Sequence, residues 1–216
     1  GYPGSDNMKD VLMIAHFVDD FDSKGNGRFN YIIDLLKYKR AEVELVTSDF
    51  SHNKKTKRDI SKVDVNYKTT FIPEPGYNNN VSIKRFYSHY IMGHNLKRYL
   101  QNSKKPDVIY CSVPSLDVAE VAAKYAKSNN IRFIIDVQDL WPEAFKMVLG
   151  LPWISDWLYY PIEKKANYIY STADVIIAVS ETYKERALIV NHTHSRAHSV
   201  YLGTELATFD KIAETN

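Results

Sequence analysis

The chain has 216 residues, of which 44% are hydrophobic, and it carries 28 Lys and Arg against 26 Asp and Glu, a net charge of +2. This length suits one large α/β domain with a substantial core and is short for two full domains. The balanced charge argues against a nucleic-acid-binding protein, which usually has a strongly basic face. A single cysteine, Cys111, excludes a disulfide framework and favours a reducing compartment.

Predicted strands and helices alternate along the chain. Apolar runs predict strands at 10–15, 42–47, 63–72, 108–112, 132–137, 173–179 and 199–202. Apolar stripes predict helices at 27–39, 82–101, 116–128 and 153–170, the last of which Pro161 should kink or split. The basic segment 52–62 is expected to be an exposed loop. Alternation of this kind predicts a Rossmann-like parallel sheet with helices on both faces.

The expected domain organisation is simple. Residues 1–7 are predicted to be a flexible leader, native or artificial, and residues 8–210 to form one Rossmann-like domain. No apolar run is long enough to span a bilayer. A cytoplasmic location is therefore expected, with peripheral contact with the inner face of the membrane left open.

Polar residues gather where the predicted strand at 132–137 ends. Asp136 is the second-to-last residue of this strand, and Gln138 and Asp139 follow the strand directly. Glu143 comes after Leu140-Trp141-Pro142. Because parallel α/β sheets bind ligands at the carboxyl ends of their strands, these side chains are candidates for substrate contact. Asp139 would equally suit the N-cap of a following helix with Pro142 in its first turn, and the two roles are compatible.

The loop after the first strand offers a second candidate site. Gly25-Asn26-Gly27 directly precedes a predicted helix, and glycines at a helix N-terminus suit phosphate binding. His16 lies at the carboxyl end of the same strand and can titrate near neutral pH. An ordinary glycine-capped loop and a non-catalytic histidine are the competing interpretations. The spacing does not match a dinucleotide-binding fingerprint, because a third glycine is missing.

Metal sites are not expected. The acidic pair Asp20 and Asp22 could hold a divalent ion beside a nucleotide diphosphate, but short acidic loops are common. His192, His194 and His198 fit no usual zinc spacing and are predicted to lie in a solvated loop. The aromatic segment 151–160 suits either core packing or contact with a membrane or a lipid-linked acceptor.

Taken in order, these segments resemble the amino-terminal half of a retaining family-4 glycosyltransferase of the GT-B type. The resemblance covers residues 8–210. Its Asp139-Leu140-Trp141-Pro142-Glu143 run resembles that of enzymes that build bacterial surface polysaccharides. Its carriers are the glycine loop 24–28, the strand 106–110, the run Asp136-Val137-Gln138-Asp139-Leu140-Trp141-Pro142-Glu143, the strand ending in Ser180-Glu181, and the segment 201–210.

This resemblance implies transfer of a sugar from a nucleotide diphosphate sugar to a hydroxyl acceptor, with no tightly bound cofactor and no metal. The amino-terminal domain would bind a saccharide or lipid-linked acceptor. A carboxyl-terminal domain, absent here, would bind the donor, with residues 211–216 starting the linker to it. Asp139 and Asp136 are the implied catalytic residues. The implied substrate-binding residues are Gly25, Asn26, Gly27, His16, Gln138, Glu143 and Ser180.

Two alternatives stay open at this point. If the chain were complete, it would be a non-catalytic subunit that binds the acceptor or the membrane and recruits a donor-binding partner. A nucleotide-dependent oxidoreductase on a Rossmann-like sheet is the other, and the broken glycine fingerprint disfavours it.

Overall fold

The computed structural model describes residues 8–21, 27–80, 82–113, 115–137, 156–178 and 197–199. It confirms the predicted fold class. Seven strands, parallel at every pairing, form one sheet in the order β5-β2-β1-β6-β7-β8-β9. The strands are β1 (Asp10–Ile14), β2 (Glu42–Ser48), β5 (Lys68–Ile72), β6 (Val108–Val113), β7 (Arg132–Val137), β8 (Val175–Ala178) and β9 (Ala197–Ser199).

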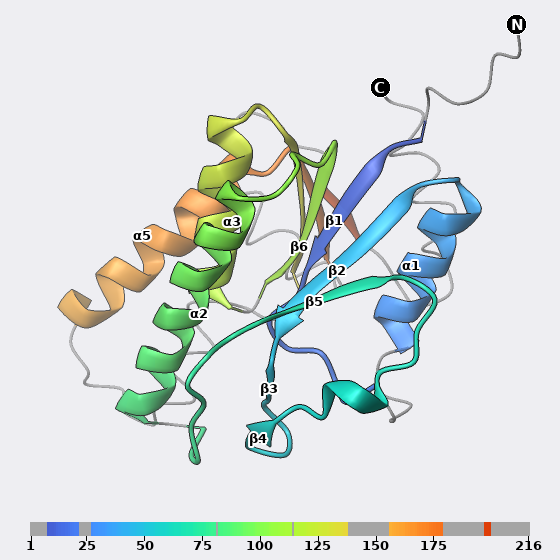
Figure 1. The fold of residues 1–216 in the computed structure, drawn as a ribbon. Helices are drawn as coiled ribbons and strands as arrows, with labels where there is room; N and C mark the ends of the chain where they lie inside the picture. The colour runs from blue at the N-terminus through green and yellow to red at the C-terminus, as the bar shows by residue number, and fades with distance from the viewer. Residues whose placement is uncertain are drawn as a thin grey trace, which may run out of the picture.

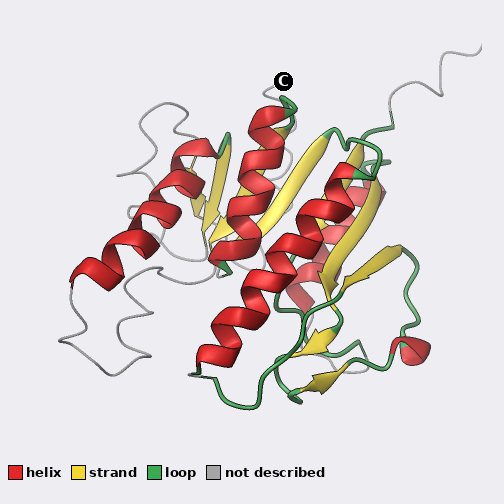
Figure 2. Cartoon of the chain, turned by 60° about the vertical axis from the view of Figure 1, so that its left-hand side comes forward, coloured by secondary structure: helices red, strands yellow, loops and turns green. Residues whose placement is uncertain are grey.

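Helices cover both faces of this sheet. Figure 1 shows α1 (Gly27–Tyr38) on one side and α2 (Ile83–Gln101), α3 (Leu116–Ser128) and α5 (Asp156–Thr172) on the other. Seen from the side of these three helices, α3 lies between α2 and α5 and packs against both (Figure 2). The described helices therefore cover the faces of the sheet and not the ends of its strands.

Alternate residues of the central strands enter two separate cores. Leu12 and Ile14 of β1 pack with α2, α3 and α5, whereas Val11 and Met13 pack with α1. All four are buried. Burial on both faces explains why these strands are continuously apolar in sequence.

Small residues bring α3 close to the sheet. Ala119, Ala122, Ala123 and Ala126 are all fully or almost fully buried. Cys111 of β6 lies in the same core as a free thiol, and burial raises its pKa to about 12. A protonated buried thiol is a packing group and a poor nucleophile.

The order in which the chain adds strands to the sheet changes sides at β1. The chain proceeds from β1 to β2 and β5 on one side, then crosses to β6, β7, β8 and β9 on the other. In open α/β sheets, ligands bind outside the carboxyl ends of the strands at such a switch point. The segments after Ile14 and Val113 are therefore where a site is expected.

Two expectations about the segment 52–72 were wrong. The segment 52–62 is not simply a loop, because β3 (Phe50–Ser51) pairs with β4 (Thr56–Lys57) in an antiparallel hairpin and a short 3₁₀ helix follows at Ile60–Lys62. The strand predicted at 63–72 begins only at Lys68. Two-residue strands are too short to show an apolar alternation, so the pattern could not reveal them.

Pro161 does not split its helix, since α5 is continuous from Asp156 to Thr172. Pro161 removes one backbone donor near the start of the helix, while Ala166, Ile169 and Tyr170 bury the following turns in the core. Within the described residues, no helix is long and apolar enough to cross a membrane.

Arg40 should be replaceable by glycine with a gain in stability. It follows α1 with φ 61°, donating its N–H to Lys37 while Ala41 donates to Leu36, and such left-handed helix ends favour glycine. We expect Arg40→Gly to raise the free energy of unfolding by about 0.5–1 kcal/mol. Urea denaturation would measure it. Arg40→Ala is the control, and an alanine variant as stable as the glycine variant would contradict the explanation.

Candidate functional site

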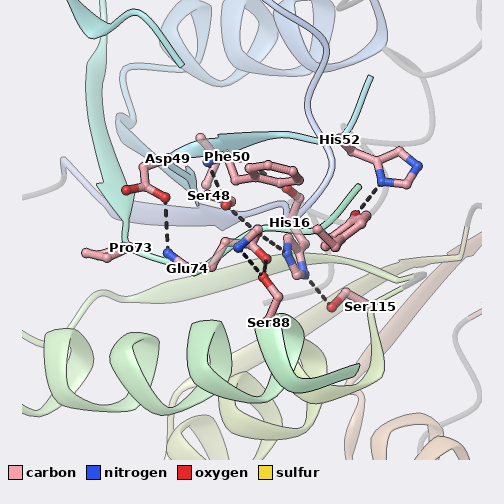
Figure 3. Close-up of polar contacts among 12 residues, drawn as sticks. His16, Ser48, Asp49, Phe50, His52, Pro73, Glu74, Ser88 and Ser115 are labelled. Carbon is pink, nitrogen blue, oxygen red and sulfur yellow. Dashed lines mark hydrogen bonds and ion pairs between the residues drawn. The ribbon is translucent and has the colours of Figure 1, made fainter. Parts of the chain in front are cut away.

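A buried carboxylate, Glu74, lies at the centre of a polar cluster beyond the carboxyl ends of the strands. It follows β5 and is only 2% exposed. Its Oε1 accepts hydrogen bonds from the hydroxyl of Ser48 at the end of β2 and from His16 Nε2 at 2.7 Å, and its Oε2 accepts from the hydroxyl of Ser88 in α2. Figure 3 shows these groups converging on Glu74. The carboxylate therefore ties β1, β2, β5 and α2 together.

The charge on Glu74 is stabilised by these contacts. Burial alone would raise the pKa of Glu74, but the hydrogen bonds from His16, Ser48 and Ser88 outweigh it and leave the pKa below its ordinary value. The cluster thus holds an ionised carboxylate at neutral pH.

His16 lies at the switch point of the sheet and joins the segments on its two sides. Its Nε2 contacts Glu74, and its Nδ1 lies 2.6 Å from the hydroxyl of Ser115, which begins the helix after β6. Both ring nitrogens are therefore engaged inside the protein, and the side chain is 2% exposed. A general base needs a free nitrogen within reach of the substrate proton, so His16 is placed to position the site and not to accept that proton.

The segment carrying Glu74 is also fixed through its backbone. The N–H of Glu74 donates to Asp49 Oδ1 at 3.0 Å, and Lys57 pairs with the same carboxylate at 3.0 Å. Gly76 adopts φ 87°, donates its N–H to Ser88, and has no room for a Cβ, which would lie 2.6 Å from the ring of Phe50. Asp49 therefore has a structural role, because it holds the backbone of Glu74 and the side chain of Lys57.

A second histidine adjoins the cluster. His89 of α2 packs edge-on against His16 with ring centroids 4.4 Å apart, and its Nε2 is buried without a hydrogen-bond partner. Burial lowers the pKa of His89 far below its ordinary value, and the neighbouring charges of His16 and Arg85 add to the effect. His89 is therefore neutral.

His16, Glu74 and His89 are the group of described residues that could hold a metal ion, with ligand atoms within 4.8 Å of one another. An ion there would have to replace the hydrogen bond between His16 and Glu74, which already satisfies both groups. The expectation that the protein binds no metal stays a prediction.

An aromatic and cationic surface lies beside the buried cluster. Phe17 stacks on His16 with centroids 4.6 Å apart, and Tyr77 hydrogen-bonds His52 through its hydroxyl. Lys55 and Arg85 lie 5.5 and 5.6 Å from the centroid of the Tyr77 ring. Tyr77 is buried, which raises its pKa to about 12. The side chains of Phe17, His52, Lys55 and Arg85 are partly exposed. This surface is the accessible part of the site.

Asp136 lies on the other face of the sheet. It is fully buried in β7 and accepts a hydrogen bond from the hydroxyl of Tyr110 at 2.5 Å. Tyr110 belongs to the core that packs on α1, whereas His16 faces α2 and α3. The catalytic role expected of Asp136 stays a prediction.

The other predicted site residues fall mostly outside the described part of the chain. Gly27 is the first residue of α1, in agreement with the helix predicted at 27–39. Six other predicted site residues lie outside the described residues: Gly25, Asn26, Gln138, Asp139, Glu143 and Ser180. The same holds for residues 1–7 and 211–216, for Asp22, and for His192 and His194, which were predicted to lie in a solvated loop. Of the predicted site, the structure therefore places His16, Gly27 and Asp136.

Sequence reasoning missed Glu74, Ser88, His89 and Ser115. Glu74 lies in Pro73-Glu74-Pro75-Gly76, which was interpreted only as the end of a strand. A signal was nevertheless present, because an acidic residue directly after an apolar strand lies at the ligand-binding edge of a parallel sheet. Ser88 and His89 sit inside a helix and carry no comparable signal.

Comparisons with known proteins identify the family through a family model and support the fold through solved structures. A family model described as "Glycosyltransferase Family 4" matches residues 28–208. No curated protein sequence matches the chain significantly.

Similar solved structures are glycosyltransferase-type proteins of low sequence identity. Sucrose-phosphate synthase from Thermosynechococcus elongatus has a TM-score of 0.58 at 11% identity, covering 96% of this chain and 98% of the other. Arabidopsis thaliana UGT89C1 complexed with quercetin has a TM-score of 0.54 at 13% identity, covering 89% of this chain and 50% of the other. Anabaena HepE in complex with UDP and glucose has a TM-score of 0.50 at 12% identity, covering 90% and 44%. The chain thus spans about half the length of UGT89C1 and of HepE.

His52 should make the fold sensitive to acid. Burial, with help from Lys55 and Arg85, lowers its pKa from 6.5 to about 4. The folded state therefore binds this proton less readily than the unfolded state, so stability present above pH 6.5 is lost as the pH falls from 6.5 towards 4. We expect an NMR titration midpoint near 4 for His52 and a falling urea midpoint across this range. The fall should be smaller in His52→Gln; an equal fall would exclude His52 as its source.

Proposed function

Because the chain belongs to glycosyltransferase family 4, we propose that it is the acceptor-binding half of a GT-B enzyme that moves a sugar from a nucleotide diphosphate sugar to a hydroxyl acceptor. The observation that carries this proposal is the polar cluster around Glu74 and His16 at the switch point of the sheet. Structures of UGT89C1 with UDP-L-rhamnose and with quercetin support a nucleotide-sugar donor and a separate acceptor. A second domain would supply most of the donor contacts.

We propose further that the transfer retains the anomeric configuration. Direct displacement with inversion needs a base that takes the proton of the acceptor hydroxyl. His16 is the described histidine at the switch point, and both of its nitrogens are engaged by Glu74 and Ser115. The resemblance of the 136–143 run to retaining enzymes points the same way.

In this proposal, backbone amides at Gly25 and Gly27 stabilise the charge that grows on the leaving phosphate. Asp139 orients the reacting hydroxyl or sugar, with Gln138, Glu143 and Ser180 in contact with substrate. Asp136 supports this segment from within β7. The acceptor belongs to bacterial surface polysaccharide or glycolipid synthesis in the cytoplasm, which rests on the Asp139-Leu140-Trp141-Pro142-Glu143 motif alone.

Peripheral contact with an anionic bilayer is part of the proposal. One face of α2 exposes four large side chains at helical spacing: Ile83, Phe86, Tyr87 and Tyr90, which are 88%, 45%, 57% and 63% exposed. The exposed Lys84 and Lys97 lie on the same helix. A groove of about 720 Å³ between α2, α3 and α5 adds Lys105, Lys124 and Lys165 to its lining. Aromatic and basic groups on one helix suit a bilayer interface.

Asp139→Ala in the complete transferase should lower turnover about a hundredfold, with the thermal unfolding midpoint almost unchanged. The test supplies a panel of nucleotide diphosphate sugars and follows transfer by mass spectrometry, with the anomeric configuration of the product read by NMR. Asp64→Ala is the matched control, because Asp64 is an exposed acid far along the chain from this segment. Unchanged turnover in folded Asp139→Ala would remove Asp139 from the site. No transfer from any donor would favour a non-catalytic subunit.

Membrane contact should depend on the α2 face. We expect the chain to sediment with vesicles of phosphatidylcholine and phosphatidylglycerol, less with phosphatidylcholine alone, and less at high salt. The double variant Phe86→Ser/Tyr90→Ser should reduce sedimentation severalfold. Tyr38→Ser is the control, because Tyr38 is 80% exposed on α1 at the opposite face of the sheet. Equal loss in both variants would exclude a specific role for α2.

A further inference from the structure

We propose that Lys55 and Arg85 form a subsite for an anionic group, a phosphate or a carboxylate, carried by the acceptor. The inference rests on the proposed function, because it names the chemical class of acceptor at the same edge of the sheet. It starts from two positive charges that the described part of the protein leaves uncompensated.

The cations next to Lys55 in the sequence are paired with acids, whereas Lys55 and Arg85 are not. Carboxylate oxygens lie within 3.5 Å of the charged groups of Lys54, Lys57 and Arg58. Lys55 instead donates to the backbone carbonyl of His52, and Arg85 donates to that of Asn80 at 2.7 Å. Among the described residues, neither has a carboxylate partner. An anion would therefore gain charge-assisted hydrogen bonds without breaking an ion pair.

Aromatic rings hold these two cations beside each other. Lys55 and Arg85 both lie over the buried ring of Tyr77, and Arg85 also lies 5.7 Å from the centroid of Phe17. Burial and the charge of Arg85 both lower the pKa of Lys55, as expected of like charges that face one another. The partly exposed rings of Phe17 and His52 would contact a sugar next to the bound anion.

The backbone of Lys55 suggests that its side chain is needed there. Lys55 adopts φ 56° in the turn between β3 and β4, where its N–H donates to Ser51. Among the described residues, the other two non-glycine residues of positive φ are Arg40 and Asn130, which follow the ends of the helices α1 and α3. Glycine fits such a turn without strain, so a lysine there gives up stability. Anion binding provides a reason for that loss.

The acceptor is the source of the anion that the position favours. The β3–β4 hairpin follows β2, and Arg85 lies in the first turn of the helix after β5, so both residues belong to the edge of the sheet beyond β1. Glu74, whose carboxylate closes the buried cluster, lies between them in sequence and fixes that edge. The donor phosphates are assigned to the second domain and to the loop after β1.

Phenyl phosphate tests the subsite directly. We expect it to bind the 216-residue chain, with NMR shifts at Phe17, His52 and Tyr77, and neutral phenyl β-D-glucoside to bind at least about tenfold more weakly. Phenyl β-D-glucuronide distinguishes a carboxylate site from a phosphate site. Arg85→Gln and Lys55→Gly should each weaken binding of the preferred anion about tenfold.

Matched controls separate binding from folding. Lys84→Gln removes the charge adjacent to Arg85, and Arg40→Gly relieves the same backbone strain as Lys55→Gly; both should leave binding unchanged. Lys55→Gly should unfold at the same or a higher temperature than the parent chain. Equal binding of the neutral glucoside, unchanged binding in Arg85→Gln and Lys55→Gly, or competition by UDP at these residues would overturn the proposal. Because no transfer is measured, this outcome is independent of whether the complete enzyme moves a sugar.

Discussion

The arrangement of this domain depends on one buried carboxylate. Glu74 receives hydrogen bonds from three side chains that come from β1, β2 and α2, while its own segment follows β5. A buried polar group left without a partner costs about 1–3 kcal/mol, so removing the carboxylate would penalise each donor at once. The same contacts fix the place where the backbone turns from β5 towards α2. A loop edge that would otherwise be adaptable becomes a rigid border of the site.

This rigidity explains how the chemistry is divided among the described residues. His16 has the position of a catalytic residue, at the end of β1, but Glu74 and Ser115 use both of its nitrogens. Its role is to join the two halves of the sheet across the switch point and to support Phe17, which stacks on it. The groups left for a ligand are those on the next layer outward, where Phe17, Lys55 and Arg85 are partly exposed. A buried polar layer that positions an accessible layer is a usual design for a binding site.

Sequence patterns predicted the sheet, whereas most members of the polar cluster around Glu74 carried no clear signal in the sequence. Strands such as Val108–Val113 are apolar on both faces because helices cover both, so periodicity and flanking residues were enough. His16 was proposed from the sequence because the carboxyl end of β1 is a position that topology singles out, and its contact with substrate stays a prediction. Ser88 and His89 could not be found, since their role depends on α2 packing beside β5, a contact between segments that no local pattern encodes. The β3–β4 hairpin was missed because its strands are two residues long.

Backbone conformation adds information that residue type hides. Arg40 and Lys55 both look like ordinary surface cations in sequence, and both have positive φ. At Arg40 the end of α1 accounts for that conformation, because its N–H and that of Ala41 close the last turn. At Lys55 the tight hairpin accounts for the φ but not for the choice of a long cation where glycine would fit better. Lys54, one residue earlier, has an acidic neighbour in Asp20, so a local need for positive charge is already met by an adjacent residue. The anion subsite proposed for Lys55 and Arg85 would give that choice a reason, because Lys55 lies over the ring of Tyr77 beside Arg85.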